Sequence, residues 1–318
     1  MTMKFGVFVP QGWRMDLTEI ADPIEQYEAM TNVAKAADQL DVFDSIWVYD
    51  HFHTVPRPTL NTTFEAWTIT AALARDTRRV NVGQMVTCNG YRSPALLAKM
   101  ASTVDVLSHG RLYFGLGAGW YEDEWRAYGY GFPETRARMR AFREACAIIT
   151  KMWTEDYPEF SGETYSIKKP INEPKGARQP HPSFWVGGSG EQVTLKLVAR
   201  FGDACNVGGG DPDVVERKLA VLRQRCDAVG RDYASIIKST SLEDVVLVKR
   251  GETPEAAVER AKSAMRPGFV GTAEELADRI RALAERGIDY VIVYIPRLAY
   301  DLDPLYTFAD EVARLVNS

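Results

Sequence analysis

An aspartate and a histidine follow a short apolar run near residue 50. The segment Phe43–His53 reads Phe-Asp-Ser-Ile-Trp-Val-Tyr-Asp-His-Phe-His, and Ile46–Val48 has the composition of a buried strand. A core strand has no structural need for Asp50 and His51 at its tip, and an imidazole can exchange a proton near neutral pH. In a chain of alternating strands and helices, functional residues gather where strands end. We therefore predict that Asp50 and His51 are functional.

Glycine gathers after three other predicted strands, at Gly115–Gly119, Gly187–Gly190 and Gly208–Gly210. Glycine removes side chains and lets backbone N–H groups approach a ligand, especially a phosphate at a helix N-terminus. Gly187–Gly190 is also compatible with a plain tight turn between a strand and a helix. Gly115–Gly119 is not a dinucleotide fingerprint, because Trp120 stands where the third glycine would be needed.

A metal site and a cysteine nucleophile are both disfavoured. His51 and His53 have a spacing that can bind zinc, but a hydrolase of that type needs further ligands on later strands. The remaining histidines, His109 and His181, are expected on the opposite face. Cys88 lacks the accompanying histidine and asparagine pattern of a catalytic thiol. We predict no metal.

Strand-like and helix-like stretches alternate along the whole sequence and make eight units, which together with the length favours a closed (β/α)8 TIM barrel over a doubly wound sheet. The predicted strands are Lys4–Val9, Ser45–Val48, Val80–Thr87, Arg111–Leu116, Phe184–Val186, Ala204–Val207, one within Ile237–Val248, and Tyr290–Ile295. The predicted helices are Ile24–Leu40, Glu65–Arg75, Pro94–Leu107, Arg136–Trp153, Gln192–Phe201, Pro212–Val229, Pro254–Met265, Thr272–Arg286 and Pro304–Val316. Thr272 and Glu275 form a capping box. We expect one domain over residues 1–318, with insertions after the fourth helix and around the seventh strand; the first, Asp156–Pro182, contains a hairpin.

Composition excludes several classes of protein. The 318 residues are 46% hydrophobic and carry a net charge of −5 with the charges interspersed, which is unlike a nucleic-acid binder. The N-terminal apolar run is too short for a signal peptide, and no stretch approaches the 18 or so apolar residues of a membrane span. Four separated cysteines without a C-x-x-C pair suit a reduced cytoplasm. We expect a cytoplasmic protein that acts on a small molecule.

Over nearly its whole length the chain resembles the luciferase-like monooxygenase family, a superfamily of barrels that use flavin or deazaflavin. Four stretches carry the resemblance together: Val48–His51, Asn89–Lys99, Ser108–Glu122 and Phe184–Gly190. The third stretch looks most like the branch that uses the deazaflavin coenzyme F420.

The resemblance implies a cofactor bed. Asp50 and His51 would lie beside the deazaflavin ring, with His51 as the proton source. Cys88 and Asn89 fall where relatives have a non-prolyl cis peptide behind the ring, and Tyr121 where they contact its polar edge. Gly187, Gly188, Ser189 and Gly190 would hold the phosphate of the cofactor tail. Five basic residues near this face could meet the anionic tail, although solvated loop charges are the commoner arrangement: Arg14, Arg57, Arg92, Lys168 and Lys169.

One position departs from the family pattern. In the sugar-phosphate and alcohol dehydrogenases of this branch a glutamate follows the second glycine of the turn, and Ala118 stands there in this chain. We therefore favour a reductase in which reduced F420 gives hydride to an electron-poor acceptor such as an activated alkene, an imine or a nitroaromatic. The alternatives are an FMN-dependent monooxygenase and a cofactor-free or sensory barrel. Relatives are often dimers, so the resemblance allows a homodimer.

Overall fold

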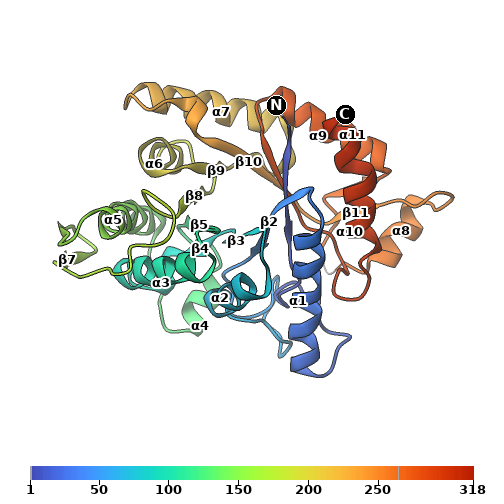
Figure 1. The fold of residues 1–318 in the computed structure, drawn as a ribbon, viewed down its shortest axis with the longest axis horizontal. Helices are drawn as coiled ribbons and strands as arrows, with labels where there is room; N and C mark the ends of the chain where they lie inside the picture. The colour runs from blue at the N-terminus through green and yellow to red at the C-terminus, as the bar shows by residue number, and fades with distance from the viewer. Residues whose placement is uncertain (1, 264) are drawn as a thin grey trace.

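Parallel strands close into a barrel at the core of the protein (Figure 1). The computed structural model describes residues 2–263 and 265–318. The barrel strands are β1 (Lys4–Phe8), β2 (Phe43–Val48), β3 (Asn81–Gln84) with its continuation β4 (Thr87–Cys88), β5 (Leu112–Gly117), β8 (Ser183–Gly187), β9 (Ala204–Asn206), β10 (Ile237–Leu242) and β13 (Tyr290–Val293). They pair in the order β3-β2-β1-β13-β10-β9-β8-β5, and the β3–β5 pairing closes the ring. Counting β3 and β4 as one strand gives eight, so the predicted TIM barrel is confirmed.

Helices surround the barrel, one or more after most strands (Figure 1). They are α1 (Pro23–Gln39), α2 (Ala66–Asp76), α3 (Pro94–Leu107), α4 (Glu122–Ala127), α5 (Thr135–Thr154), α6 (Thr194–Phe201), α7 (Pro212–Asp227), α8 (Pro254–Ala261), α9 (Ala273–Glu285), α10 (Asp303–Thr307) and α11 (Ala313–Asn317). Short 3-10 helices lie at Asn89–Tyr91, Gly208–Gly210 and Tyr233–Ser235. A short π-helix at Phe308–Val312 joins α10 to α11. The capping box of Thr272 and Glu275 is present at α9 as predicted.

Two predicted elements around the seventh strand differ from the structure, and the predicted strand Val80–Thr87 is interrupted between β3 and β4. The predicted seventh strand is divided: only β10 belongs to the barrel, and β11 (Val245–Leu247) pairs with β12 (Phe269–Gly271) in a separate two-stranded sheet. The helix predicted over Pro254–Met265 ends at Ala261, and Ala264 lies outside the described residues. The change of direction after Leu242 takes the chain out of the barrel ladder, which apolar periodicity alone could not reveal.

The predicted hairpin after the fourth helix is confirmed. It consists of β6 (Glu159–Ser161) and β7 (Ser166–Lys168), paired antiparallel, and it lies on the side of the molecule opposite α8 (Figure 1). Glu144 of α5 anchors its turn, because its carboxylate accepts the backbone N–H groups of residues 163, 164 and 165 at 2.9–3.1 Å.

Aromatic rings fill the inside of the barrel. Trp47 of β2 is completely buried and packs against Trp185 at a centroid distance of 4.8 Å. The neighbouring strands make room for its indole with glycine: a Cβ on Gly6 of β1 would lie 2.5 Å from Trp47 Nε1. The indole N–H donates to the hydroxyl of Ser45 on the same strand. The apolar run Ile46–Val48, predicted as a buried strand, therefore also contributes Trp47 to the packing inside the barrel.

Gly6→Ala is expected to lower the free energy of unfolding by about 1–3 kcal/mol, because an added methyl group would overlap Trp47 and force it to move. Chemical denaturation measures the loss. In a Trp47→Phe background, which removes Nε1, the same substitution should cost less. Strictly additive effects of the two substitutions would contradict this packing account.

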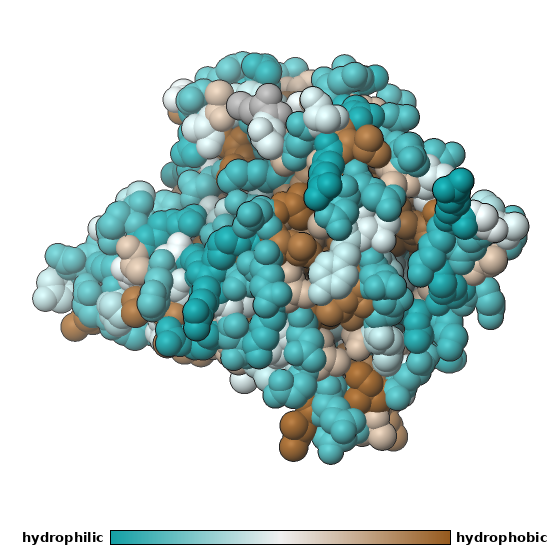
Figure 2. All heavy atoms as spheres, turned by 45° about the vertical axis from the view of Figure 1, so that its right-hand side comes forward, coloured by the Kyte–Doolittle hydropathy of each residue, from teal (hydrophilic) through white to brown (hydrophobic). Residues whose placement is uncertain are grey.

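The outer surface is mainly hydrophilic. Seen from the side of α8 and α10, apolar side chains reach the surface mostly within a recess between more polar regions (Figure 2). Among the residues that the structure describes, no helix combines the length and the apolar character needed to cross a membrane.

Candidate cofactor site at the carboxyl ends of the strands

A cavity of about 370 Å³ lies where β2, β4, β5 and β8 end. Of the predicted site residues, Asp50, His51, Cys88, Tyr121 and the turn Gly187–Gly190 line it. Asn89 is buried but is not among the lining residues. The cavity is also lined by residues that the sequence did not single out for the cofactor: Trp13, Tyr49, Met85, Val86, Thr87, Tyr91, Gly117, Ala118, Gly119, Trp120 and Thr194.

His51 is held from two sides. Its ring stacks on the indole of Trp13 with the centroids 4.7 Å apart, and its Nδ1 lies 3.1 Å from Oε2 of Glu124. The rings of Trp120 and Tyr121 approach it edge-on, each at 5.9 Å. Its Nε2 makes no hydrogen bond to any described residue. Nε2 is thus the ring nitrogen left for a ligand.

Glu124 of α4 collects four hydrogen-bond donors although its own residue is completely buried. Besides His51, it accepts the hydroxyl of Tyr91 at 2.6 Å and the backbone N–H groups of Phe52 at 2.6 Å and His53 at 3.2 Å. Burial alone would raise the pKa of Glu124, but these hydrogen bonds outweigh burial and lower its pKa below the ordinary value.

The charge of Glu124 fixes the tautomer of His51. An ionised carboxylate can only accept hydrogen bonds, so Nδ1 of His51 must carry the proton that is shared with it. Nε2 then accepts a proton when the imidazole is neutral and donates one when it is charged. The pair can therefore work as a general acid or base whose orientation is set by a buried anion.

Glu124 was missing from the predicted site. It lies on a helix of six residues that follows the glycine-rich turn, and so short a helix shows no apolar periodicity. The available signal was the acidic first turn Glu122–Glu124 directly after the predicted residue Tyr121. Nothing in the sequence indicated that the third acid of this turn points inward to a histidine more than 70 positions earlier.

Asp50 serves as an anchor within the cavity wall. One of its oxygens accepts the backbone N–H of Cys88 at 2.8 Å, and Arg92 donates to both oxygens at 2.7 and 3.0 Å. Burial raises the pKa of Asp50, while Arg92 and the Cys88 amide oppose that shift. Arg92 also pairs with Glu65, so this arginine is not a solvated loop charge. The network ties the end of β2 to the end of β4.

The cis peptide expected at Cys88–Asn89 is not there. The non-prolyl cis bond joins Met85 and Val86 instead, in the interruption between β3 and β4 where the chain leaves and rejoins its ladder with β5. Asn89 opens a short helical turn and donates to the hydroxyl of Tyr165 in the hairpin at 3.4 Å. Burial raises the pKa of the Cys88 thiol to about 12, which keeps it protonated.

Several of the glycines have a packing role. A Cβ on Gly117 would lie 2.6 Å from Val86 Cγ2, and one on Gly187 would lie 2.5 Å from Val86 Cγ1. The side chain of Val86 therefore fills the space that these glycines leave between β5 and β8. A Cβ on Gly119 would lie 2.4 Å from the Cys88 sulfur. Gly117 and Gly119 therefore have a packing role, and both also line the cavity, so the expected approach of a ligand to them stays a prediction.

The turn after β8 presents free backbone donors. The N–H groups of Gly188, Ser189 and Gly190 donate to no other group in the described chain, and all three residues line the cavity. Gly188 has a φ of +99°, a conformation that side chains rarely adopt. Consecutive free amides of this kind bind anions. The turn therefore fits a phosphate group.

One buried hydroxyl also faces this region without a partner. Thr87 of β4 lines the cavity, is completely buried, and its Oγ1 makes no hydrogen bond within the described chain. A buried polar atom of this kind normally has a partner. Thr87 thus fits the polar edge of a ring bound next to it. Tyr121, predicted for that role, lines the cavity too, with its hydroxyl 3.4 Å from the Pro56 carbonyl oxygen.

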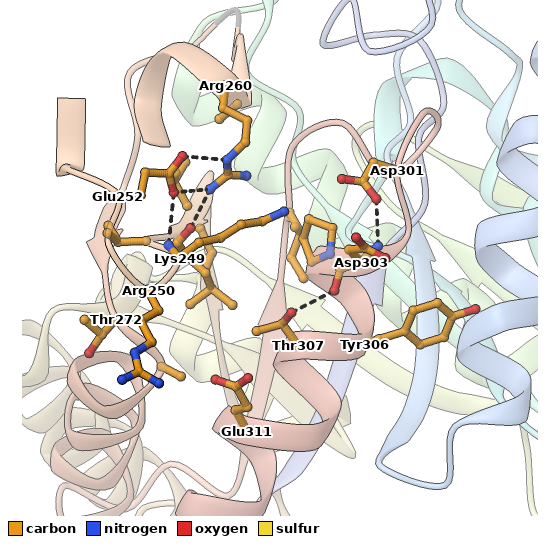
Figure 3. Close-up of a pocket in the computed structure, with 18 of the residues that line it drawn as sticks. Lys249, Arg250, Glu252, Arg260, Thr272, Asp301, Asp303, Tyr306, Thr307 and Glu311 are labelled. Carbon is orange, nitrogen blue, oxygen red and sulfur yellow. Dashed lines mark hydrogen bonds and ion pairs between the residues drawn. The ribbon is translucent and has the colours of Figure 1, made fainter. Parts of the chain in front are cut away.

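A larger cavity of about 810 Å³ shares no lining residue with the first. It lies between β11, α8 and the start of α10, and one ion pair joins charged side chains of its lining (Figure 3). Glu252 accepts two hydrogen bonds from Arg260 at 2.8 Å, and Asp301 accepts the backbone N–H of Asp303. No histidine is among the described residues that line it. Among the described residues, no group of three or more metal-ligating side chains is close enough to hold a metal.

The fold and the site define a (β/α)8 barrel protein with a ligand cavity at the carboxyl ends of its strands. The chain belongs to the luciferase-like monooxygenase family, since the profile of that family matches residues 3–269.

Two curated relatives and one solved structure illustrate its similarities. An F420-dependent glucose-6-phosphate dehydrogenase of Kineococcus radiotolerans is 32% identical over 207 residues, which are 63% of this chain and 59% of the relative. An FMNH2-dependent dimethylsulfone monooxygenase of Pseudomonas putida is 26% identical over 265 residues, 72% of each chain. A structure of an F420-dependent secondary alcohol dehydrogenase with an F420-acetone adduct superimposes over the full length of both chains with a TM-score of 0.78 at 19% identity. The match to the first of these relatives spans about three-fifths of its length.

Proposed function

We propose that this protein is a flavin- or deazaflavin-dependent oxidoreductase, that its cofactor is F420, and that it acts as a reductase on a small organic acceptor. The observation that carries the proposal is the placement of the His51–Glu124 pair and the three free amides of Gly188–Gly190 in one cavity. A ring with a phosphate-bearing tail matches both features. Family membership and the F420-dependent relatives support the choice of cofactor.

Bound reduced F420 would supply a hydride, since carbon replaces nitrogen at the reactive position of a deazaflavin. The protein's own contribution is to place and protonate the acceptor. His51 would donate the balancing proton from Nε2, while Glu124 keeps Nδ1 protonated and stabilises the imidazolium. The stacked indole of Trp13 prevents rotation of the imidazole. Holding donor and acceptor in such a geometry can be worth up to about 7–11 kcal/mol.

The direction of hydride transfer is supported by Ala118. This residue lines the cavity with a methyl group at the position where the family's alcohol and sugar-phosphate dehydrogenases have an acid. A methyl group cannot remove the proton of an alcohol. Steady oxidation of simple alcohols by the protein with oxidised F420 would contradict the proposed direction.

Titration with each cofactor tests the proposal. F420 and FMN are added separately while visible absorbance and fluorescence are recorded, and reduced F420 is then mixed with a panel of alkenes, imines and nitroaromatics. We expect stoichiometric binding of F420 and reoxidation by at least one acceptor in the absence of oxygen. Tight FMN binding with oxygen consumption would favour the monooxygenase alternative, which the similarity to the dimethylsulfone monooxygenase supports. Binding of neither cofactor would favour a cofactor-free barrel.

Gly187→Ala should weaken cofactor binding while the protein stays folded. The new methyl group would overlap Val86, which would have to move toward the cavity next to the amide turn. We expect F420 affinity to fall by at least about tenfold, a free-energy change of about 1.4 kcal/mol. The double substitution Gly187→Ala with Val86→Ala should restore part of the affinity. Unchanged affinity in Gly187→Ala would contradict the described packing.

A further inference from the structure

The charges around the cavity carry information about the substrate. No lysine or arginine is among the residues that line the cavity in the described chain. The only carboxylate in the lining, Asp50, is paired with Arg92. A substrate with a phosphate or carboxylate group beside the ring would thus find no lysine or arginine there.

Two arginines beside lining residues, Arg92 and Arg14, are engaged by carboxylates, while Arg138 donates to the carbonyl oxygen of the lining residue Gly119 at 2.6 Å. Arg92 bonds to Asp50 and Glu65. Arg14, which follows the cavity residue Trp13, bonds to Glu243 at 2.8 Å and also to Asp244, and its side chain is nearly buried. Releasing either guanidinium for a substrate would leave a buried carboxylate, Asp50 or Asp244, without its partner, which is strongly unfavourable.

A carboxylate stands next to the cavity wall on the β10 side. Glu243 accepts hydrogen bonds from the hydroxyl of Tyr49, a lining residue, at 2.9 and 3.1 Å. Its side chain is more than one-third exposed. Two carboxylates, Glu243 and Asp244, share Arg14, which leaves this arginine no free position for an anionic substrate.

The cavity offers aromatic surface instead. Trp120 lines it and is nevertheless 63% exposed, an unusual state for so large an apolar side chain. Its ring is perpendicular to that of His51 at 78° and lies 5.2 Å from Tyr121. An exposed indole beside the proton donor can stack on a flat group.

We infer that the substrate is an uncharged, planar, conjugated molecule that stacks on Trp120, and that sugar phosphates are excluded. This inference rests on the proposed function for the role of the cavity and adds the substrate class. It separates the chain from the relative whose name includes glucose 6-phosphate. The volume of about 370 Å³, at the lower end for ligand pockets, further implies a small substrate once a cofactor ring is present.

A pair of ligands of nearly equal shape tests the inference. Equilibrium dialysis on the cofactor-loaded protein compares para-nitroacetophenone, which is neutral, with para-nitrobenzoate, which is an anion at neutral pH. We expect the ketone to bind at least about tenfold more tightly, because the carboxylate would have to lose its hydration in a cavity lined by no lysine or arginine. Equal or tighter binding of para-nitrobenzoate, or saturable binding of glucose 6-phosphate, would overturn the inference.

Substitution of the indole provides the second arm. Trp120→Ala should weaken binding of the ketone by roughly three- to tenfold. Tyr157→Ala is the matched control, since Tyr157 is 65% exposed but absent from the cavity lining. Equal effects of the two substitutions would also overturn the inference. If the proposed function is wrong, F420 will not bind. That result is seen before the ligands are added, so it is distinguished from failure of the substrate inference.

Discussion

His51→Asn is expected to lower turnover of reduced F420 by roughly a hundred- to ten-thousandfold, while F420 affinity stays close to that of the wild type. The asparagine amide nitrogen can occupy the place of Nδ1 and keep the hydrogen bond to Glu124. What the variant loses is Nε2, the nitrogen proposed to deliver the proton. The hydride step is then left without its acid.

Stopped-flow reoxidation of reduced F420 under anaerobic conditions measures the rate, and fluorescence titration measures the affinity. His51→Gln is the informative comparison, because its amide reaches toward the position of Nε2 and leaves Glu124 one donor short. We expect this variant to be both inactive and less stable. A His51→Asn enzyme that retains wild-type turnover would remove His51 from the mechanism.

Glu124→Gln should lower the free energy of unfolding by about 2–4 kcal/mol and reduce turnover by roughly ten- to a hundredfold. The carboxylate receives four donors, from His51, Tyr91 and the amides of Phe52 and His53. A carboxamide turns an NH2 group toward some of these donors and leaves them without a partner. If that NH2 donates toward Nδ1 of His51, it also favours the opposite tautomer.

Glu122→Gln is the matched control on the same helix. Glu122 is half-exposed and pairs with Arg126 at the surface, where an ion pair contributes at most about 1 kcal/mol. Chemical denaturation of both variants gives the difference directly. Equal stability of Glu124→Gln and Glu122→Gln would contradict the account of the buried carboxylate.

The pH dependence of stability provides a separate check on Glu124. Its pKa is lower in the folded protein than the ordinary value of 4.5. Its ionisation therefore contributes stability above that pH, and the contribution is lost as the pH falls through the folded-state pKa. The stability difference between wild type and Glu124→Gln should shrink on acidification below pH 4.5. A difference that grows below that pH would have the wrong sign.

The barrel was predictable because its signals are local. Most barrel strands contain a short apolar run and most helices have periodic apolar faces, so the order of elements followed from the sequence, as did caps such as Thr272 with Glu275. The pairing of β11 outside the barrel was not predictable. Its apolar sequence is equally compatible with pairing to barrel strands and with pairing to β12. Pairing partners are a property of the whole fold.

The site was partly predictable for the same reason. Asp50, His51 and Gly187–Gly190 stand directly after strands, and the structure brings them to one cavity. Glu124 was not recognised, and Arg92 was considered only as a possible contact of the cofactor tail, because their importance comes from partners distant in the chain. The role of Gly117 depends on Val86 in the interruption between β3 and β4, which no local pattern reveals.

A crystal structure of the protein with F420 bound tests most directly whether the coenzyme occupies the cavity beside His51. We expect electron density for the deazaflavin ring beside His51, with Nε2 facing its reactive edge. We also expect density for the phosphate within hydrogen-bonding distance of the amides of Gly188–Gly190. Density for the coenzyme in the separate cavity between β11, α8 and α10 would contradict the account, as would an empty site at saturating coenzyme.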